Sequence, residues 1–293
     1  MAQTILLTGA SGGFGRLIAH GLIAKDYRVF ASMRAVQGRN RDVAKELEAK
    51  GAIVLEMDVT DDASLAACID KVLEQAGQLD VVINNAGVGV LGLQETFTAQ
   101  DLQRLFEINV IGVHRVNRAV LPHMRKKKQG LLVHISSLLG RITIPFYGPY
   151  NASKWALEAL TENYSTELSG FGIDVCIVEP GGYPTTFMEH LMRPSDAERA
   201  ESYGNMAKAP EQMFAGFEQA LAANPAQKPQ DVADAVVALL QMPAGQRPFR
   251  TVVDAMGMGQ AVQGYNQQLA KITRAVYGNF GIDSMLSRRK GDD

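Results

Sequence analysis

Two side chains that could move a proton stand four residues apart in this sequence, Tyr150 and Lys154. In a helix that spacing places both on one face, where they can approach the same substrate. A tyrosine phenol ordinarily has a pKa of about 10, too high for an efficient base near neutrality, and a neighbouring ammonium group favours the phenolate. The pair therefore predicts acid-base chemistry at a substrate oxygen, with Tyr150 as the group that gives or takes the proton.

Two hydroxyl groups stand at the end of an apolar run upstream of this pair. Residues 131–135 read as a buried strand, and Ser136 and Ser137 follow it directly. At a strand end a hydroxyl group can donate a hydrogen bond to the same substrate oxygen and hold it in place during the reaction. Position alone is compatible with either serine.

A glycine-rich turn near the amino terminus could bind a phosphate group. It reads Thr8-Gly9-Ala10-Ser11-Gly12-Gly13-Phe14-Gly15 and stands between a predicted strand and a helical pattern. Glycine lets the backbone approach a pyrophosphate, and the following helix offers unpaired N–H groups and the positive end of its dipole. The spacing G-x-x-x-G-x-G departs from the usual dinucleotide fingerprint G-x-G-x-x-G, and glycine-rich turns are also common without a ligand.

The elements that must position these groups alternate along the chain. Short aliphatic or β-branched runs, separated by amphipathic stretches, occur at 4–7, 28–30, 52–55, 80–83, 131–135, 175–178 and 251–253. Because most of them are continuously apolar, they predict strands buried on both faces of a parallel sheet. The sequence therefore predicts an α/β, doubly wound Rossmann-type fold with a roughly seven-stranded parallel sheet flanked by helices.

This alternation favours a single domain over residues 1–293. It is interrupted between Pro184 and Pro229, where Met, Ala, Gln and Pro concentrate, and we expect a small helical lobe at about 184–229. Helical spacing returns at Leu269, Ile272 and Val276, which predicts a helical extension over about 260–293.

Composition excludes several classes of protein. The chain has 293 residues, and its 29 Lys and Arg against 31 Asp and Glu give a net charge of −2. That balance argues against nucleic acid or an anionic membrane as a partner bound through bulk charge. With 46% hydrophobic and 20% charged residues, the chain has the composition of a folded globular protein.

Neither the cysteines nor the histidines are spaced for a metal ion. Cys68 and Cys176 lie far apart, and the five histidines are scattered, so we expect no metal site and two reduced core thiols. The amino terminus does not read as a secretory signal, and no apolar run approaches the roughly 20 residues that span a bilayer. We therefore expect a cytoplasmic protein without a membrane span.

Further motifs follow the predicted strands. Asn84-Asn85-Ala86-Gly87 follows the fourth strand, and Tyr150-Asn151-Ala152-Ser153-Lys154 opens a helix after the fifth. Together with Gly9, Gly13 and Gly15, they resemble the short-chain dehydrogenase/reductase family over roughly residues 3–260, most of all its hydroxysteroid and retinol dehydrogenase-like members. The resemblance implies a nicotinamide dinucleotide bound by Thr8, Gly9, Ser11, Gly13, Phe14, Gly15, Arg34, Asp58, Val59, Asn85, Ala86, Gly87, Tyr150, Lys154, Pro180, Gly181 and Thr185.

The resemblance also implies a catalytic set. Asn109 matches the helix asparagine that in the family anchors a water in a proton relay. Ser137 stands at the spacing from Tyr150 found in hydroxysteroid dehydrogenases, and on that ground we prefer it to Ser136. Tyr150 and Lys154 complete the set.

The choice between NADP and NAD depends on the end of the second predicted strand. Arg34 lies nineteen positions after Gly15, near the place expected for the residue that reads the ribose 2′ position, and no acidic residue follows until Asp42. A guanidinium suits a 2′-phosphate, so we expect NADP(H) to be preferred, with NAD(H) possible. A solvated arginine among Arg39 and Arg41 is the alternative, and Gly12 stands where NADP-dependent relatives often carry a basic residue.

The segment after the sixth predicted strand suggests an apolar substrate pocket. In the family this segment forms the substrate lobe, and here it is rich in methionine and aromatic residues, which suit an adaptable apolar site. We expect a medium-sized hydrophobic alcohol or carbonyl substrate, bound by Val90, Leu91, Ser137, Phe146, Tyr183, Phe187 and Met188. More distant residues such as Met213 and Phe217 are better explained by helix packing.

The predicted function is an NADP(H)-dependent oxidoreductase that interconverts a secondary alcohol and a ketone or aldehyde by hydride transfer. The alternatives are a non-catalytic NADP(H)-sensing regulator on the same fold, an NAD-preferring dehydrogenase, and an epimerase or dehydratase, against which the glycine spacing argues. Family members commonly pair through the helices that carry Asn109 and Tyr150, which implies a homodimer or homotetramer.

Overall fold

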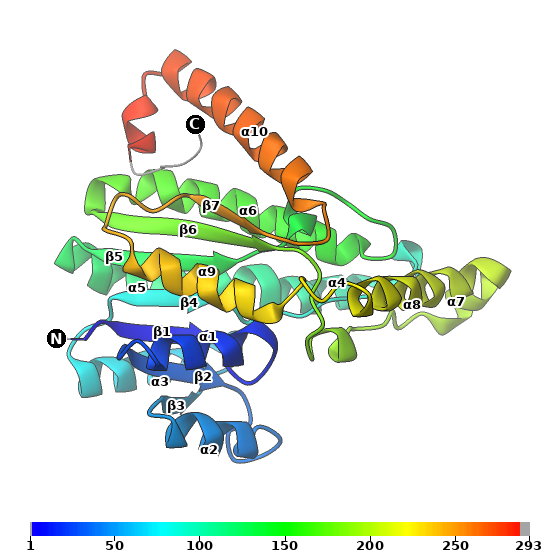
Figure 1. The fold of residues 1–293 in the computed structure, drawn as a ribbon, viewed down its shortest axis with the longest axis horizontal. Coiled ribbons are helices and arrows are strands. Elements are labelled where there is room, and N and C mark those ends of the chain that lie inside the picture. Colours follow the sequence, from blue (N-terminus) through cyan, green and yellow to red (C-terminus); the bar gives the residue numbers. More distant parts are fainter. Residues whose placement is uncertain (1, 288–293) are drawn as a thin grey trace.

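A seven-stranded parallel sheet forms the centre of the molecule in a computed structural model, which describes residues 2–287 (Figure 1). The strand order is β3-β2-β1-β4-β5-β6-β7, and every neighbouring pair is parallel. The strands are β1 Thr4–Thr8, β2 Arg28–Met33, β3 Ile53–Glu56, β4 Val81–Asn84, β5 Gly130–Ile135, β6 Ile173–Pro180 and β7 Arg250–Val253. All seven predicted strands are present, and the predicted fold class is confirmed.

Helices cover both faces of this sheet (Figure 1). One apolar cluster joins the strands to α1, α2 and α9, and a second joins them to α3 and α5 on the opposite face. The residues of β1, β4 and β5 are buried throughout, as the continuously apolar runs predict for a doubly covered sheet. The helices are α1 Gly13–Ile23, α2 Arg41–Ala49, α3 Asp62–Ala76, α4 Ala99–Phe106, α5 Gly112–Lys127, α6 Gly148–Glu167, α7 Ala197–Ser202, α8 Ala209–Ala222, α9 Pro229–Gln241 and α10 Gly259–Asn279.

The carboxyl ends of the strands meet at one edge of the sheet, because all the strands are parallel. The glycine-rich turn follows β1 at this edge, the Asn84–Gly87 segment follows β4, and Ser136 and Ser137 follow β5. Helix α6 begins nearby with Pro149 in its first turn, where the missing N–H of proline costs no helical hydrogen bond. This arrangement explains why motifs far apart in the sequence converge.

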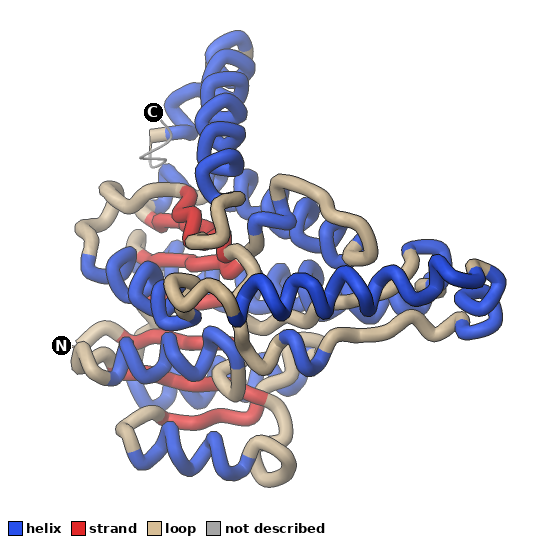
Figure 2. Tube along the Cα trace, turned by 45° about the vertical axis from the view of Figure 1, so that its right-hand side comes forward, coloured by secondary structure: helices blue, strands red, loops and turns tan. Residues whose placement is uncertain are grey.

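The predicted helical lobe lies between β6 and α9. Helices α7 and α8 extend away from the sheet, joined by a 3-10 segment at Gly204–Lys208 (Figure 2). The lobe is therefore helical, as predicted, and stands beside the carboxyl edge of the strands.

The chain ends beyond the sheet in a long helix, α10, followed by a short 3-10 helix at Asp283–Leu286 that packs against α6. These helices lie within the segment of about 260–293 for which a helical extension is predicted, and residues 288–293 of that segment lie outside the described residues. Cys68 and Cys176 are free and buried. Within residues 2–287, no helix is both long enough and apolar enough to cross a bilayer.

Candidate functional site

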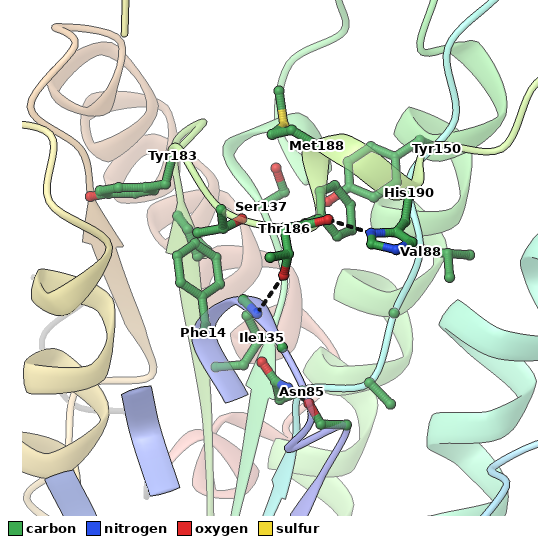
Figure 3. Close-up of a pocket in the computed structure, with 18 of the residues that line it drawn as sticks. Phe14, Asn85, Val88, Ile135, Ser137, Tyr150, Tyr183, Thr186, Met188 and His190 are labelled. Atoms are coloured by element: carbon green, nitrogen blue, oxygen red, sulfur yellow. Dashed lines mark hydrogen bonds between the residues drawn. The ribbon is translucent and has the colours of Figure 1, made fainter. Parts of the chain in front are cut away.

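A cavity of about 960 Å³ opens at the carboxyl edge of the strands and is lined by every motif named above (Figure 3). Its walls include the glycine-rich turn, the ends of β2 through β6, the start of α6 and the base of the lobe. Of the predicted residues it brings together Gly9, Ser11, Gly13, Phe14, Arg34, Asp58, Val59, Asn85, Ala86, Gly87, Ser137, Tyr150, Lys154, Pro180, Gly181, Tyr183, Thr185, Phe187 and Met188. One cavity thus holds most of the predicted cofactor residues and several of the predicted substrate residues.

The glycine-rich turn has the geometry that its sequence requires. Gly9 and Gly13 have φ angles of +67° and +52°, in the left-handed region that favours glycine. A Cβ atom on Gly9 would come within 2.8 Å of the Cα of Ala86. The turn therefore lies tightly against the segment after β4, and Gly12, Gly13 and Phe14 at the start of α1 line the cavity.

Thr8 and Asn85 join the glycine-rich turn to the segment after β4 by hydrogen bonds. The Thr8 hydroxyl accepts hydrogen bonds from the N–H groups of Asn85 at 3.0 Å and Ala86 at 2.9 Å. In return, the Asn85 amide donates to the carbonyl oxygens of Thr8 and Gly9, both at 3.0 Å. Thr8 does not itself line the cavity, so its contribution to a cofactor site is to shape the turn.

Tyr150, Ser137 and Lys154 surround the floor of the cavity. Ser137 hydrogen-bonds to the Tyr150 phenol, and the Lys154 ammonium lies 5.7 Å from the centre of the Tyr150 ring. Lys154 Nζ donates to the carbonyl oxygen of Ile135 at 2.9 Å, which fixes it at the end of β5. Ser136, the alternative hydroxyl, also lines the cavity, but its Oγ is buried without a hydrogen-bond partner among the described residues.

The pKa of Tyr150 differs from the sequence-based expectation. Burial raises it to about 12, and the hydrogen bond from Ser137 only partly opposes this effect. Burial also lowers the pKa of Lys154 to about 8, although the carboxylate of Glu158 counteracts part of that fall. In the protein alone the phenol is thus protonated near neutrality, because its desolvation outweighs the hydrogen bond from Ser137.

Asn109 lies one layer behind this floor, in a π-helical segment at Glu107–Ile111. Its Oδ1 accepts from the Val88 N–H and its Nδ2 donates to the Val88 carbonyl oxygen, both at 2.9 Å. The same amide donates to Ser153 Oγ at 3.1 Å. Asn109 therefore holds the cavity wall at Val88 against α6, while its part in a proton relay stays a prediction.

The far end of the cavity carries positive side chains. Arg34 is 47% exposed, and its guanidinium lies 3.7 Å from the Asp58 carboxylate, so part of the side chain remains accessible to a ligand. Arg39 and Asn40 line the same end, and the Asn40 amide donates to the Arg34 carbonyl oxygen at 2.6 Å. Arg39, which the sequence offered only as a solvated neighbour, thus belongs to the cavity, whereas Arg41 lies outside its lining.

The base of the lobe closes the opposite side of the cavity. The Phe187 ring lies 6.0 Å from the Tyr150 ring, and Tyr183 packs edge-on against Phe14 at 5.5 Å. The Thr186 hydroxyl accepts from the Gly13 N–H at 3.1 Å, so the lobe touches the glycine-rich turn directly (Figure 3).

Several predicted residues support the cavity without lining it. Val90 and Leu91 are only 1% exposed and pair with Met192, so they anchor the lobe. Phe146 packs in the apolar cluster beneath the lobe, and the neighbouring Tyr147 lines the cavity in its place. A Cβ atom on Gly15 would come within 2.2 Å of the Gly9 carbonyl oxygen, so Gly15 permits the tight turn.

Other lining residues escaped the sequence-based predictions. They include Arg39, Asn40, Thr186 and His190, together with Met213 and Phe217, which the sequence assigned to helix packing. Thr186 and His190 are neighbours of predicted residues, so the lobe segment as a whole could have been chosen. For Met213 and Phe217 no local signal existed, because α8 reaches the cavity only through the bend of the lobe.

The sequence of this chain is similar to those of a known protein family. A sequence model of the family described as short chain dehydrogenase matches residues 3–196, more than half of the chain. The chain belongs to this family. Membership identifies a nicotinamide dinucleotide-dependent oxidoreductase and confirms the family resemblance drawn from the motifs.

Curated members of the short-chain dehydrogenase family with similar sequences act on different compounds. A 3-ketodihydrosphingosine reductase of Bacteroides thetaiotaomicron is 36% identical over 64% of this chain and 66% of its own length. Retinol dehydrogenase 8 of Bos taurus is 33% identical over 81% of this chain and 78% of its own length. The 17-beta-hydroxysteroid dehydrogenase type 1 of Mus musculus is 33% identical over 82% and 70%, respectively.

Solved structures of the family share the fold. A short-chain dehydrogenase from Streptomyces avermitilis matches with a TM-score of 0.76 and 29% identity, over 96% of this chain and 97% of that one. A metagenomic short-chain oxidoreductase in complex with NADP has a TM-score of 0.66 and 28% identity, covering 86% and 96%. A Burkholderia phymatum family member in complex with NAD has a TM-score of 0.73 and 25% identity, covering 93% and 95%.

Proposed function

We propose that this family member is an NADP(H)-dependent oxidoreductase that interconverts a secondary alcohol and a ketone or aldehyde on a medium-sized hydrophobic substrate. The observation that carries this proposal is the single cavity, which joins the glycine-rich turn and Arg34 at one end to Ser137, Tyr150 and the apolar base of the lobe at the other. The elongated dinucleotide would extend from the Arg34 end past the turn, with its reactive ring above the floor of the cavity.

Acid-base catalysis follows from the arrangement of the floor. The bound nicotinamide would supply or accept the hydride at the substrate carbon. In the reducing direction, Tyr150 donates its phenolic proton to the carbonyl oxygen, which its high pKa favours because the phenol is protonated at neutral pH. Ser137 holds the same oxygen by a hydrogen bond, and the Lys154 ammonium stabilises the phenolate that remains.

The apolar end of the cavity supports a hydrophobic substrate. Phe187, Met188, Met213 and Phe217 enter it from the lobe, and Tyr147 from the start of α6. Methionine and aromatic side chains adapt their shape to an apolar ligand at little cost. Three curated relatives named for a sphingoid base, retinol and a steroid also favour an apolar alcohol or ketone.

The preference for NADP rests on the charge at the other end. Arg34 and Arg39 both line the cavity, and a guanidinium can bind a phosphate through two parallel hydrogen bonds. No carboxylate comes from the end of β2 itself, although Asp58 lies 3.7 Å from Arg34. The Gly12 position carries no positive charge, so the two arginines supply the discrimination.

The decisive test combines cofactor titration with turnover. Purified protein is titrated with NADPH and NADH by fluorescence and then assayed with steroid, retinoid and long-chain ketones by loss of NADPH absorbance. Tyr150→Phe should lower kcat/KM by about 10²- to 10⁴-fold, because the general acid is lost, while NADPH affinity changes little. NADPH binding without turnover of any of these substrates would favour the sensing regulator instead.

A further inference from the structure

A third ionisable side chain, that of Glu158, lies on the same face of α6 as Tyr150 and Lys154. Glu158 follows Lys154 at the spacing of four residues that aligns Tyr150 with Lys154, so all three share one face of the helix. The three residues are 8%, 6% and 1% exposed. A carboxylate is thus buried one helical turn beyond the lysine of the proposed active site.

Glu158 takes part in a buried cluster of charges. Its Oε2 lies 2.5 Å from the Arg141 guanidinium and 3.5 Å from that of Arg250. The other oxygen, Oε1, is buried without a hydrogen-bond partner among residues 2–287. The two arginines thus approach one oxygen of this carboxylate, while its other oxygen has no hydrogen-bond partner in the described part of the chain.

Two further carboxylates share the same arginines. Glu179 on β6 lies 3.3 Å from both Arg141 and Arg250, and it also accepts a hydrogen bond at 2.6 Å from Asn266 on α10. Glu162, one turn beyond Glu158, contacts both arginines and is 24% exposed. The cluster thus contains three carboxylates and two guanidinium groups, drawn from α6, β6, β7 and the loop after β5.

We infer that Glu158 is a positioning residue that keeps the Lys154 side chain in its charged form. The inference rests on the proposed function for its catalytic consequence, because Lys154 must be an ammonium group to stabilise a Tyr150 phenolate. Glu158 contacts neither substrate nor cofactor, and it affects catalysis only through the charge of Lys154.

The electrostatic reason lies in the burial of Lys154. Desolvation disfavours the ammonium form and lowers the pKa of Lys154 to about 8, close enough to neutrality for part of the charge to be lost. The Glu158 carboxylate raises that pKa again, since an opposite charge nearby favours the charged form. Removing this carboxylate should therefore let Lys154 lose its proton at a lower pH.

The other groups around Lys154 do not replace this effect. His134 of β5 is fully buried, and burial lowers its pKa to about 4, so it is neutral near pH 7. Among the remaining groups, Tyr150 contributes a protonated phenol, and Arg141 and Arg250 add positive charge. Glu162 is 24% exposed and lies two helical turns from Lys154, and burial raises the pKa of Glu179 to about 7, so part of its negative charge is lost near neutrality.

The test measures the ionisation of Lys154 directly. Protein carrying lysine labelled with ¹³C at Cε is titrated by NMR, and the Lys154 signal is assigned by its absence in Lys154→Met. Glu158→Gln should lower the Lys154 pKa by about one pH unit, the lower end of what a nearby opposite charge contributes. Glu162→Gln is the matched control, because it removes one negative charge from the same two arginines and should leave the Lys154 pKa within a few tenths.

Equal shifts in the two variants, or none in Glu158→Gln, would overturn the inference. If Glu158→Gln does not fold, Glu158→Asp keeps a carboxylate in the cluster and should hold the Lys154 pKa within a few tenths of wild type. A fall of a full unit in that variant would contradict a role that depends on charge.

Kinetics then separate this inference from the proposed function. The alkaline limb of the pH profile of kcat/KM should move to lower pH in Glu158→Gln by the same amount as the NMR titration, and stay in place in Glu162→Gln. A merely structural role would lower kcat/KM at every pH without moving the limb. An NMR shift without turnover in wild type would leave the Glu158 assignment standing and refute the proposed function.

Discussion

The sheet and the helical lobe are built in opposite ways. Side chains of the central strands, such as Ile5, Leu7 and Ile83, are completely buried between two layers of helices. In the lobe, α7 buries no residue, and α8 buries only Pro210 and Leu221. The buried side chains that stabilise the fold therefore lie mainly in the sheet. The lobe lines the cavity but buries few side chains of its own.

The lobe is held mainly at its two ends. Near its start, Met192 exchanges backbone hydrogen bonds with Gly89 at 2.9 Å and Leu91 at 3.0 Å, and Ser195 donates its hydroxyl to the Asp101 carboxylate at 2.7 Å. Near its end, the Gln227 amide donates to the Gly182 carbonyl oxygen at 2.7 Å. The two backbone hydrogen bonds of Met192 do not depend on side-chain identity, whereas the bonds of Ser195 and Gln227 do.

Truncating one apolar side chain in each region gives the sharpest contrast. Ile5→Ala should reduce the free energy of unfolding by about 2–5 kcal/mol, because a fully buried side chain leaves a cavity in a packed core. Met213→Ala, which removes a half-buried lobe side chain that lines the site, should cost less than about 1 kcal/mol and instead raise KM for hydrophobic substrates. Urea unfolding measures the stability of each variant, and steady-state kinetics measure its KM. Comparable losses of stability in Ile5→Ala and Met213→Ala would contradict the difference between the sheet and the lobe.

The preference for NADPH over NADH should depend on Arg34, which follows β2 of the sheet, and not on the lobe. Arg34→Asp should weaken NADPH binding by about 10- to 100-fold relative to NADH, since hydrogen bonds between charged groups contribute about 1.5–3 kcal/mol. Arg41→Asp makes the same charge change outside the cavity lining and serves as the control. Fluorescence titration gives both affinities, and identical behaviour of the two variants would remove Arg34 from the proposed 2′-phosphate site.

The smallest expected effect concerns pH at the anchored start of the lobe. Burial raises the pKa of Asp101, but hydrogen bonds from Ser195 and Thr98 outweigh it and lower that pKa to about 2, below the ordinary value of 3.8. The carboxylate therefore contributes fully above about pH 4, and its contribution is lost as the pH falls toward 2.

Limited proteolysis of the lobe checks this sign. Cleavage of wild type should not change between pH 5 and 8 once the protease's own pH dependence is corrected with an unstructured substrate. Asp101→Asn should be cleaved a few-fold faster at every pH in that range, because an amide accepts weaker hydrogen bonds than a carboxylate. Faster cleavage of wild type at pH 5 than at pH 8 would show that another group controls the lobe.

The sequence by itself determined the parts of this protein whose requirements are local. Seven short apolar runs predicted seven strands, because a strand covered on both faces is largely apolar. Gly9 and Gly13 predicted a turn that only glycine fits easily, and Tyr150 and Lys154 predicted a shared helix face. Parallel strands then required these motifs to meet at one edge of the sheet.

Tertiary structure alone decided what depends on packing between distant segments. In the folded chain Arg39 and Met213 line the cavity, whereas Val90 and Phe146 pack beneath the lobe. The pKa of Tyr150 is raised, the opposite of the direction expected from the sequence. Each of these outcomes depends on which groups are desolvated and which charges face one another. Burial of this kind is a property of the whole folded chain, whereas the period of a strand or the φ angle of a glycine belongs to a few neighbouring residues.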